Sequence, residues 1–531
     1  MVGRTIRPAP TPSLPSVSGL QVFALIFTAI FLLHAPLLRL PYFWDEAGYY
    51  IPAAYDFFQY GQLIPHSTLS NAHPPLPGIY LGLWWKLSAF KPAVTRIAML
   101  LIAALALTAV FRLARFLSNV PVAIATVFCT AIFPVWFAQS SLAHADLAAA
   151  ALTLWGLAYY FEAKDSAARK QWLAVLLFAL AGLAKETAVI TPLALACWDA
   201  GLALRSRGDR WSSRDDLWRA GLLLLSIVPV ALWFLYYHHR TGYFFGNPEY
   251  FRYNLGSTLI PVRVFLSFVR RIWQLLGYMG MLLLTLFTVY AMSLPALKDD
   301  GIERQRIPLS AQYRIAIVIF AHIIAFSLLG GAVLARYQLP AYPLLILIWV
   351  STLRRRLRWW KPAIVLVIAV FVVFLFNNPI NASPPEDNLQ YRDFVIMHKH
   401  AANYLSQHYA HVPVLTAWPA TDELRLPYLG YVNRPLNTLA VENFAPENLM
   451  KIAQQPQTFA TLLIFSTKHY PKYEIRWKFW EEASGKYYEY HRDLSPDAAA
   501  QLLGGTVVWR EEKRDQFAAI IDMQRSELAR E

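Results

Sequence analysis

The chain has 531 residues, of which 56% are hydrophobic and 15% are charged, whereas soluble globular proteins carry roughly 25% charged residues. The apolar residues fall in long runs, which excludes an ordinary soluble enzyme and indicates a membrane protein. The formal net charge of +14 raises nucleic acid as a partner. The basic residues, however, cluster in short stretches between apolar runs, as they do in cytoplasmic loops of membrane proteins. We therefore expect no nucleic-acid partner.

Eleven apolar segments are candidates for helices that cross a bilayer core, which takes roughly 20 residues per helix. They are 18–40, 94–114, 120–139, 142–161, 171–185, 187–204, 218–238, 271–292, 313–332, 337–353 and 362–380. The fifth and sixth form one stretch that is broken near Ala184-Lys185-Glu186. This pattern predicts a polytopic α-helical transmembrane domain over residues 1–380.

The short basic loops predict the orientation of these segments. With the N-terminus inside, all of these loops fall on the inner side, as the positive-inside rule requires. Their basic residues are Arg112 and Arg115; Lys164, Arg169 and Lys170; Arg205, Arg207, Arg210 and Arg214; Lys298, Arg304 and Arg306; and Arg354, Arg355, Arg356, Arg358 and Lys361. Because the number of segments is odd, the C-terminal region then lies outside. We expect a multi-pass protein of the bacterial inner membrane whose C-terminal domain is periplasmic.

Two hydrophilic regions face outward in this arrangement. Residues 41–93 form the first outer loop, in which Pro74–Phe90 is aromatic and poor in charge. A twelfth span there would invert every later loop, so we predict interfacial helices in this loop instead. Residues 381–531 are long enough for one α/β domain. Its expected elements are a helix over 391–409 and strands over 412–417, 461–466 and 506–510.

Two polar motifs stand in the first outer loop. Asp45 and Glu46 follow the first apolar segment, and neighbouring side chains on a helix diverge by about 100°, so one of them would face a reaction site and the other would not. The alternative is that both acids favour the dipole at a helix N-terminus. His73 precedes Pro74-Pro75, which holds it at the mouth of a helix. The alternative is an ordinary polar loop residue.

Further polar residues lie at the ends of later apolar segments. Asp146, beside His144, begins the fourth segment and either caps it or marks a functional site, because a carboxylate near hydrocarbon is costly. Lys185 and Glu186 lie at the break between segments five and six, where they either neutralise each other or bind substrate. Arg336 opens the tenth segment, where an interface anchor is the alternative.

These residues lie at the same depth in the predicted topology, and they were not used to derive that topology. Asp45, His73, Asp146, Lys185 and Arg336 all fall at the outer membrane boundary. Carboxylates beside cations at that depth suit binding of an anionic lipid headgroup and deprotonation of an acceptor. A transporter or flippase of lipid-linked substrates is the main alternative, and a non-catalytic assembly scaffold is a third. Transport sites, however, lie near the midplane on broken helices related by repeats, and we detect no inverted repeat.

The motifs resemble those of the C-class polyprenyl-phosphate glycosyltransferases (GT-C), in particular the protein O-mannosyltransferases and lipid A aminoarabinose transferases. Asp45-Glu46 resembles the acidic motif of their first outer loop, and His73-Pro74-Pro75-Leu76 is similar to the His-Pro-Pro-Leu of the mannosyltransferases. Asp146 resembles their second acidic residue, and Lys185 resembles the lysine at the same helix break. Arg336-Tyr337-Gln338-Leu339-Pro340 is similar to their Tyr-x-Leu-Pro element, whose tyrosine approaches the lipid phosphate.

The resemblance covers roughly residues 17–380 and has two departures. Pro77-Gly78 stands where the mannosyltransferases have Gly-Lys, which puts a protein acceptor in doubt. The aminoarabinose enzymes have lysine at the position of His73, which argues against aminoarabinose as the sugar.

The resemblance implies an inverting displacement in which Asp45 acts as general base on the acceptor hydroxyl and polyprenyl phosphate leaves. Asp146 and Glu46 complete the expected catalytic set. The expected substrate-binding residues are His73, Lys185, Glu186, Arg336 and Tyr337, with Arg252 and Arg263 from the outer loop between the seventh and eighth segments.

The expected partners are a polyprenyl-phosphate-linked sugar donor, an envelope acceptor (lipid, glycan or protein) and membrane lipids. We expect no cofactor. We also expect no metal, because a lysine can neutralise the donor phosphate without a divalent ion.

Overall fold

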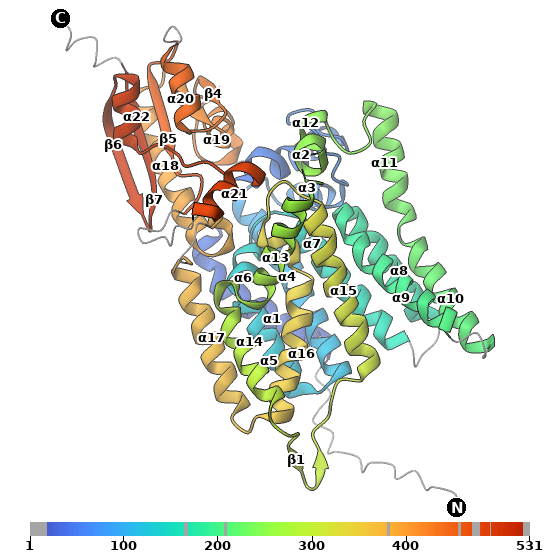
Figure 1. Ribbon diagram of the computed structural model, residues 1–531. Helices are drawn as coiled ribbons and strands as arrows, with labels where there is room; N and C mark the ends of the chain where they lie inside the picture. The colour runs from blue at the N-terminus through green and yellow to red at the C-terminus, as the bar shows by residue number, and fades with distance from the viewer. Residues whose placement is uncertain are drawn as a thin grey trace, which may run out of the picture.

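The computed structural model describes residues 18–163, 168–205, 210–256, 258–379, 383–454, 458–469, 478–488 and 490–523. A bundle of helices forms most of the molecule, and a smaller part with a β-sheet sits on one end of it (Figure 1). A helical membrane fold followed by an α/β domain was the prediction from the sequence, and this fold class is confirmed.

Each apolar segment of the sequence contains a helix. These helices are α1 (Gly19–His34), α4 (Pro92–Leu117), α5 (Val120–Ile132) with α6 (Pro134–Gln139), α7 (Ala145–Glu162), α8 (Ala168–Ala184), α9 (Ile190–Arg205), α10 (Arg210–Leu225) with α11 (Val228–Thr241), α13 (Pro261–Leu276) with α14 (Met281–Met292), α15 (Leu309–Leu328), α16 (Ala341–Arg356) and α17 (Trp360–Phe376). Six helical stretches among the described residues are long and apolar enough to cross a membrane by length and composition. The number of eleven spans stays a prediction.

Local sequence signals explain where several helices begin and end. Ser18 and Gln21 form a capping box at the start of α1, which satisfies otherwise unpaired backbone N–H groups. Asn119 caps α5 by accepting from the N–H of Val122. Gly242 ends α11 in the left-handed conformation (φ 79°), which glycine adopts at no steric cost.

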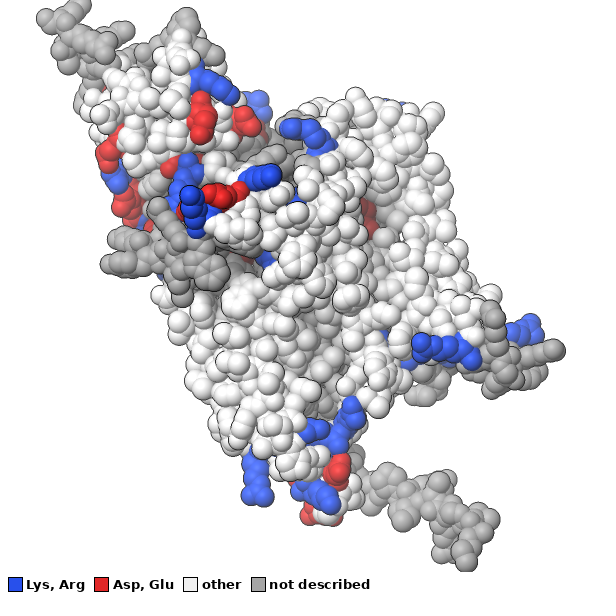
Figure 2. All heavy atoms as spheres, viewed as in Figure 1, with Lys and Arg blue, Asp and Glu red and all other residues white. Residues whose placement is uncertain are grey.

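The outer surface of the bundle is apolar. Large hydrophobic side chains such as Leu25, Phe128 and Leu232 are exposed, and the middle of the face seen in Figure 2 has almost no charged side chains. Lysine, arginine, aspartate and glutamate gather instead at its two ends. This distribution is typical of a lipid-facing surface and supports a multi-pass membrane protein.

Inside the bundle, small residues let the helices approach closely. Ala150, Ala151 and Gly156 are on the buried face of α7, and a Cβ atom on Gly156 would come within 2.7 Å of Phe178 of α8. Close backbone approach through small residues is the usual way in which membrane helices pack, because the lipid offers no hydrophobic driving force.

The first outer loop is helical. After the 3₁₀-helix η1 (Ala35–Leu37) it contains the π-helix η2 (Glu46–Tyr50), α2 (Ile51–Tyr60) and α3 (Leu76–Leu87). Because α3 has 12 residues, it is about 18 Å long, well short of a bilayer core of about 30 Å. Its length agrees with the prediction of an interfacial helix rather than a further span.

The C-terminal domain contains a five-stranded sheet in the order β4-β3-β5-β7-β6. Its strands are β3 (Val414–Ala417), β4 (Thr438–Val441), β5 (Thr461–Phe465), β6 (Thr506–Lys513) and β7 (Gln516–Asp522), and its helices are α18 (Gln390–His408), α19 (Ala420–Arg425), α20 (Pro446–Ala453), α21 (Lys478–Tyr488) and α22 (Pro496–Leu503). β3 is parallel to both β4 and β5, whereas β7 is antiparallel to β5 and β6. The sequence analysis missed β4 and β7. β6 and β7 are joined by Arg514 and Asp515, which both have positive φ, as a type I′ hairpin turn requires.

The C-terminal domain rests on the first outer loop. The hydroxyl of Tyr431 donates to the carbonyl of Tyr42 at 2.9 Å, and Gly430 packs on Pro41. α19 also packs against η2. The two outward regions predicted from the sequence therefore form one layer at the same end of the bundle.

A short hairpin lies at the opposite end of the bundle (Figure 1). β1 (Lys298–Asp299) pairs with β2 (Ile302–Glu303), and Glu303 binds Arg355 at the end of α16 at 2.6 Å. Among the predicted inner-loop residues, Lys164 and Arg207 lie outside the described residues. The separation of this hairpin from the C-terminal domain agrees with the orientation predicted from charge.

The orientation predicts how single cysteines react in intact spheroplasts. In a Cys197→Ser background, which removes the exposed native cysteine, Ser67→Cys and Ser495→Cys should react with a membrane-impermeant maleimide. Ile302→Cys in the hairpin, a residue that is 74% exposed, should react only after permeabilisation. Labelling of Ile302→Cys in intact spheroplasts, or of only one of the two outer positions, would contradict the topology.

Candidate active site

A cavity of about 2560 Å³ opens between the outer end of the bundle and the C-terminal domain. Six of the predicted site residues line it: Asp45, His73, Lys185, Glu186, Arg336 and Tyr337. The side chain of Asp146 lies behind this wall, bound to Lys185. The tertiary structure thus brings together residues from four separate segments of the chain.

Asp45 is placed in the cavity by a strained turn. Trp44, directly before it, has φ 44°, a left-handed conformation that bulky residues rarely adopt. The Trp44 ring packs edge-on against Phe394 and Trp418 of the C-terminal domain, and these contacts hold the turn. The side chain of Asp45 remains 28% exposed and pairs with Nη2 of Arg336.

Arg336 is the centre of the charged cluster. It lies in η7 (Ala335–Gln338), and its side chain is 3% exposed. Besides Asp45 it contacts Glu386 at 2.7 Å and Asp146 at 3.6 Å. A buried guanidinium is tolerated when carboxylates surround it in this way. The cluster therefore joins the first outer loop, the start of α7 and the segment that leads into the C-terminal domain.

Lys185 forms the cationic side of the site. It has an extended conformation between α8 and η4 (Glu186–Val189), at the break that the sequence predicted. Its Nζ lies 2.6 Å from Asp146 and 4.5 Å from the centre of the Tyr337 ring. The guanidinium of Arg271, from α13, lies 5.4 Å from the same ring. Positive charge thus surrounds Tyr337, as an anionic ligand at this point would require.

His73 and Glu186 form a second pair on the cavity wall. The Nδ1 of His73 lies 3.0 Å from Oε2 of Glu186, and the hydroxyl of Tyr250 lies 3.5 Å from Nε2 of the same ring. As at Trp44, the preceding residue is strained: Ala72 has φ 58°, and its carbonyl accepts from Trp233 at 2.9 Å.

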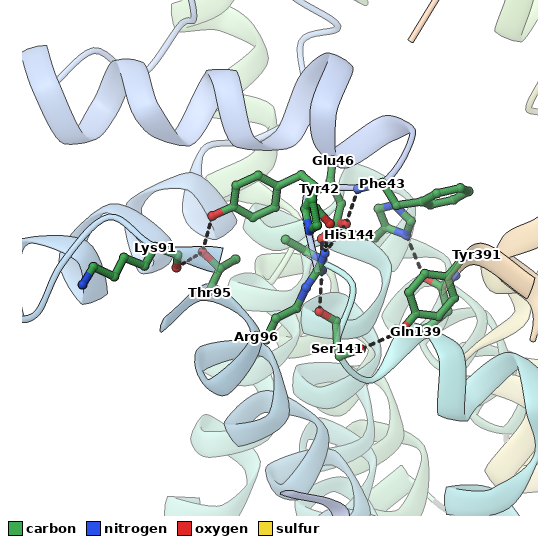
Figure 3. A network of polar contacts seen from close by, with 12 residues as sticks. Tyr42, Phe43, Glu46, Lys91, Thr95, Arg96, Gln139, Ser141, His144 and Tyr391 are labelled. Carbon is green, nitrogen blue, oxygen red and sulfur yellow. Dashed lines mark hydrogen bonds and ion pairs between the residues drawn. The ribbon is translucent and has the colours of Figure 1, made fainter. Parts of the chain in front are cut away.

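Glu46 does not reach the cavity. Its side chain is 0% exposed and binds Arg96 of α4 through both carboxylate oxygens, as Figure 3 shows. It also accepts from the backbone N–H groups of Phe43 and Ala143, at 2.8 Å and 2.6 Å. Every lone-pair direction of Glu46 is used inside the protein, so its carboxylate has no oxygen available to a ligand in the cavity. We correct the predicted catalytic role to a structural one.

Two predicted phosphate ligands also lie elsewhere. Arg252, in η5 (Arg252–Gly256), is exposed and does not line the cavity. Arg263 is buried, and its guanidinium donates to backbone carbonyls, among them that of Gly331 at 2.7 Å. It holds a loop in place instead of facing a ligand. Arg270, two turns further along α13, lines the cavity in their place.

The sequence analysis missed the acidic pair Glu386-Asp387. It lies in η8 (Pro385–Asp387), in the segment between α17 and α18, where Asp387 accepts from the hydroxyl of Tyr278 at 2.7 Å. A signal was present in the sequence, because Pro384-Pro385 and the two acids begin only four residues after the end of the last apolar segment. The sequence analysis also missed Arg270 and Arg271, which lie at the start of the eighth apolar segment. An ionisable residue at such a position indicates a functional site.

Among the residues that the structure describes, no three histidine, cysteine, aspartate or glutamate side chains are grouped as metal ligands. Asp45 and Asp146 both face cations. The expectation of a metal-free reaction stays a prediction.

Comparisons with known proteins bear on the family and the fold of the chain. The family model described as dolichyl-phosphate-mannose-protein mannosyltransferase matches residues 72–233. The fold is similar to that of ArnT from Cupriavidus metallidurans, solved bound to undecaprenyl phosphate (TM-score 0.55) and in the apo state (TM-score 0.54). In both comparisons the identity is 15%, and 95% of this chain and 98% of that chain are covered. No curated protein matches the sequence.

At this identity the solved structures establish a shared fold. The motif-based resemblance to the C-class glycosyltransferases is confirmed by this fold together with the family match. The matched range contains His73, Asp146 and Lys185.

The geometry of Glu46 predicts an effect on stability. Glu46→Gln leaves Arg96 buried without a counter-charge, which typically costs about 3–5 kcal/mol. The thermal unfolding midpoint of the purified protein should therefore fall sharply. The control Glu303→Gln removes the exposed pair with Arg355 and should change stability by less than about 1 kcal/mol. An unchanged midpoint for Glu46→Gln would contradict the structural role.

The cluster also predicts a pH dependence of stability. Burial, with Asp45, Asp387 and Asp146 close by, raises the pKa of Glu386 from 4.5 to about 8, although Arg336 opposes the shift. Between these values the folded chain holds a proton that the unfolded chain has lost, so the free energy of unfolding falls as pH rises from about 5 to about 8. Glu386→Gln should flatten this fall, measured as unfolding midpoint against pH. Glu303→Gln should not, and equal slopes for Glu386→Gln and the parent protein would refute the assignment.

Proposed function

We propose that the protein is a glycosyltransferase that moves a sugar from a polyprenyl-phosphate donor to an envelope acceptor, with inversion at the anomeric carbon and Asp45 as general base. The observation that carries this proposal is the cavity itself: a partly exposed carboxylate, a cluster of cations and a long apolar wall lie in one space at the end of the bundle. The shared fold with ArnT, which was solved bound to undecaprenyl phosphate, supports a lipid-phosphate donor.

The reaction follows from the positions of the charges. Asp45 takes the proton of the acceptor hydroxyl, whose oxygen forms a bond to the anomeric carbon while the bond from that carbon to the phosphate oxygen breaks. The phosphate leaves with the electron pair and its charge increases. Lys185 and Tyr337 stabilise that charge. A single displacement of this kind inverts the anomeric configuration.

The neighbouring residues hold these groups in place. Asp146 binds Lys185 at 2.6 Å and is a positioning residue in this scheme. Arg336 orients the carboxylate of Asp45. Arg270 lines the wall beyond Tyr337 and is the candidate for a second phosphate contact, in place of Arg252 and Arg263.

The apolar part of the cavity suits a polyprenyl chain. Trp273, Leu282 and Leu286 line it from α13 and α14, and Val370 and Phe374 line it from α17. A chain that lies against these helices would place its phosphate at the charged cluster. The proposal includes the bacterial inner membrane as the location, with the cavity and the C-terminal domain on the periplasmic side.

A transporter is less well supported. Ionisable residues of transport sites lie near the bilayer midplane, whereas this cluster lies where the bundle meets the C-terminal domain.

Two substitutions separate chemistry from donor binding. Asp45→Asn keeps the size of the side chain but removes the base, which typically costs about 10²–10⁴ in rate, while donor binding should survive. Lys185→Ala should weaken donor binding as well as turnover, because it removes charge from the phosphate site. The measurement is a reconstituted enzyme with a radiolabelled polyprenyl-phosphate sugar, in which retained donor and transferred sugar are counted separately.

The control in this assay is Glu303→Gln, far from the cavity, which should behave as the parent enzyme. Transfer by Asp45→Asn at a rate near that of the parent enzyme would remove Asp45 as base and would make transport the better explanation.

A further inference from the structure

Two tryptophans form a corner of the cavity beside Asp45. Trp44 directly precedes Asp45, and Trp418 follows strand β3 of the C-terminal domain. Their rings are 5.4 Å apart and nearly perpendicular, at 82°. Both line the cavity, and Trp418 is 40% exposed. An indole ring with this much exposed surface, at the junction of two domains, can pack against a ligand.

The corner is held rigidly. Trp418 lies so close to Gly48 of η2 that a Cβ atom there would come within 2.3 Å of its ring nitrogen, so this approach requires glycine. The ring also packs edge-on against Trp44. On the other side, the hydroxyl of Thr68 donates to the carbonyl of Gly48 at 2.9 Å. The aromatic surface is thus preorganised, which lowers the entropy cost of binding.

Polar groups surround the aromatic corner. Asp422 and Arg425 form an ion pair at 2.8 Å on the cavity wall, and the side chain of Arg425 is 57% exposed. Ser67 and His66 face the cavity from the first outer loop. The buried carboxylate of Asp56 fixes this loop by accepting from the backbone N–H groups of both residues.

This combination matches the chemistry of a sugar ring. A sugar has an apolar face of C–H groups, which packs on an indole, and a rim of hydroxyls, which pair with carboxylate, guanidinium and hydroxyl groups. The opposite part of the cavity, along α13, α14 and α17, is apolar and suits the donor chain. The aromatic corner beside Asp45 therefore suits a sugar, and the apolar wall along α13, α14 and α17 suits a lipid chain.

We propose that the acceptor is a saccharide whose terminal ring packs in the Trp44–Trp418 corner and presents a hydroxyl to Asp45. The inference rests on the proposed transferase function and deepens it by naming the acceptor class. The saccharide is either a free glycan or the headgroup of a glycolipid, since both present the same chemistry at this corner. Trp418 is a specificity-determining residue for the acceptor and takes no part in donor binding.

The test uses the full-length protein in lipid nanodiscs, because sugar-based detergents would occupy the corner themselves. The donors are undecaprenyl-phosphate-linked [¹⁴C]mannose, [¹⁴C]glucose and [¹⁴C]galactose. The acceptors are methyl glycosides and trisaccharides, octyl glycosides, and a hexapeptide with serine and threonine. Saturation-transfer NMR with the same glycosides measures acceptor binding without any donor.

We expect transfer to glycosides and none to the peptide. Trp418→Ala should raise the acceptor KM about tenfold, the scale of one lost aromatic contact, and should leave the donor KM unchanged. Trp418→Phe keeps an aromatic face and should restore most of the affinity. Trp172→Ala, at an exposed tryptophan of α8 outside the cavity, is the matched control. Equal use of methyl and octyl glycosides indicates a free glycan, and preference for octyl glycosides indicates a glycolipid.

The outcomes separate this inference from the transferase proposal. Transfer to the peptide alone, or absence of saturation transfer to every glycoside, overturns the saccharide acceptor. A Trp418→Ala variant that loses kcat or donor affinity with an unchanged acceptor KM also overturns it, because the residue is then only structural. Glycoside binding that depends on Trp418, without discharge of any donor, supports the saccharide site and contradicts the transferase reaction.

Discussion

One buried guanidinium organises the outer end of this protein. Arg336 is nearly inaccessible and contacts Asp45, Asp146 and Glu386. A charge in such surroundings is stable only when its counter-charges and hydrogen-bond acceptors are held against it, so these three side chains and the segments that carry them are fixed together. The first outer loop, the start of α7 and the entry to the C-terminal domain cannot move independently while this cluster is intact. The cavity takes its shape from that constraint.

The adjacent acids Asp45 and Glu46 show how helical geometry separates two roles. Glu46 turns inward to Arg96 and closes the base of the first outer loop on α4, while Asp45 turns to the cavity. Both carboxylates pair with an arginine. They differ in access to solvent, because Glu46 is fully enclosed and Asp45 is partly exposed. The first pair therefore contributes stability, and the second leaves a lone pair available to a substrate.

The C-terminal domain is a part of the site. It supplies Trp418 against Gly48 and Trp44, and the segment that leads into it supplies Glu386 to Arg336. The strained backbone of Trp44 is held by contacts with this domain. A cavity built between a membrane bundle and an attached domain can present an apolar wall to a lipid chain and a polar corner to a second substrate, and Asp45 lines the same cavity.

The sequence by itself determined what depends on runs of neighbouring residues. The apolar segments specify a helical membrane domain, the polar interruption at Lys185 specifies a broken helix, and the prolines after His73 specify the start of α3. It did not decide which charges meet, because Asp45 and Arg336 are 291 positions apart and His73 and Glu186 are 113 apart. Only the tertiary structure showed that Glu46 is enclosed, that Arg263 serves backbone carbonyls, and that Glu386 and Trp418 reach the site. The physical reason is that burial and charge pairing are properties of packed surfaces, and distant segments of the chain meet only in the folded molecule.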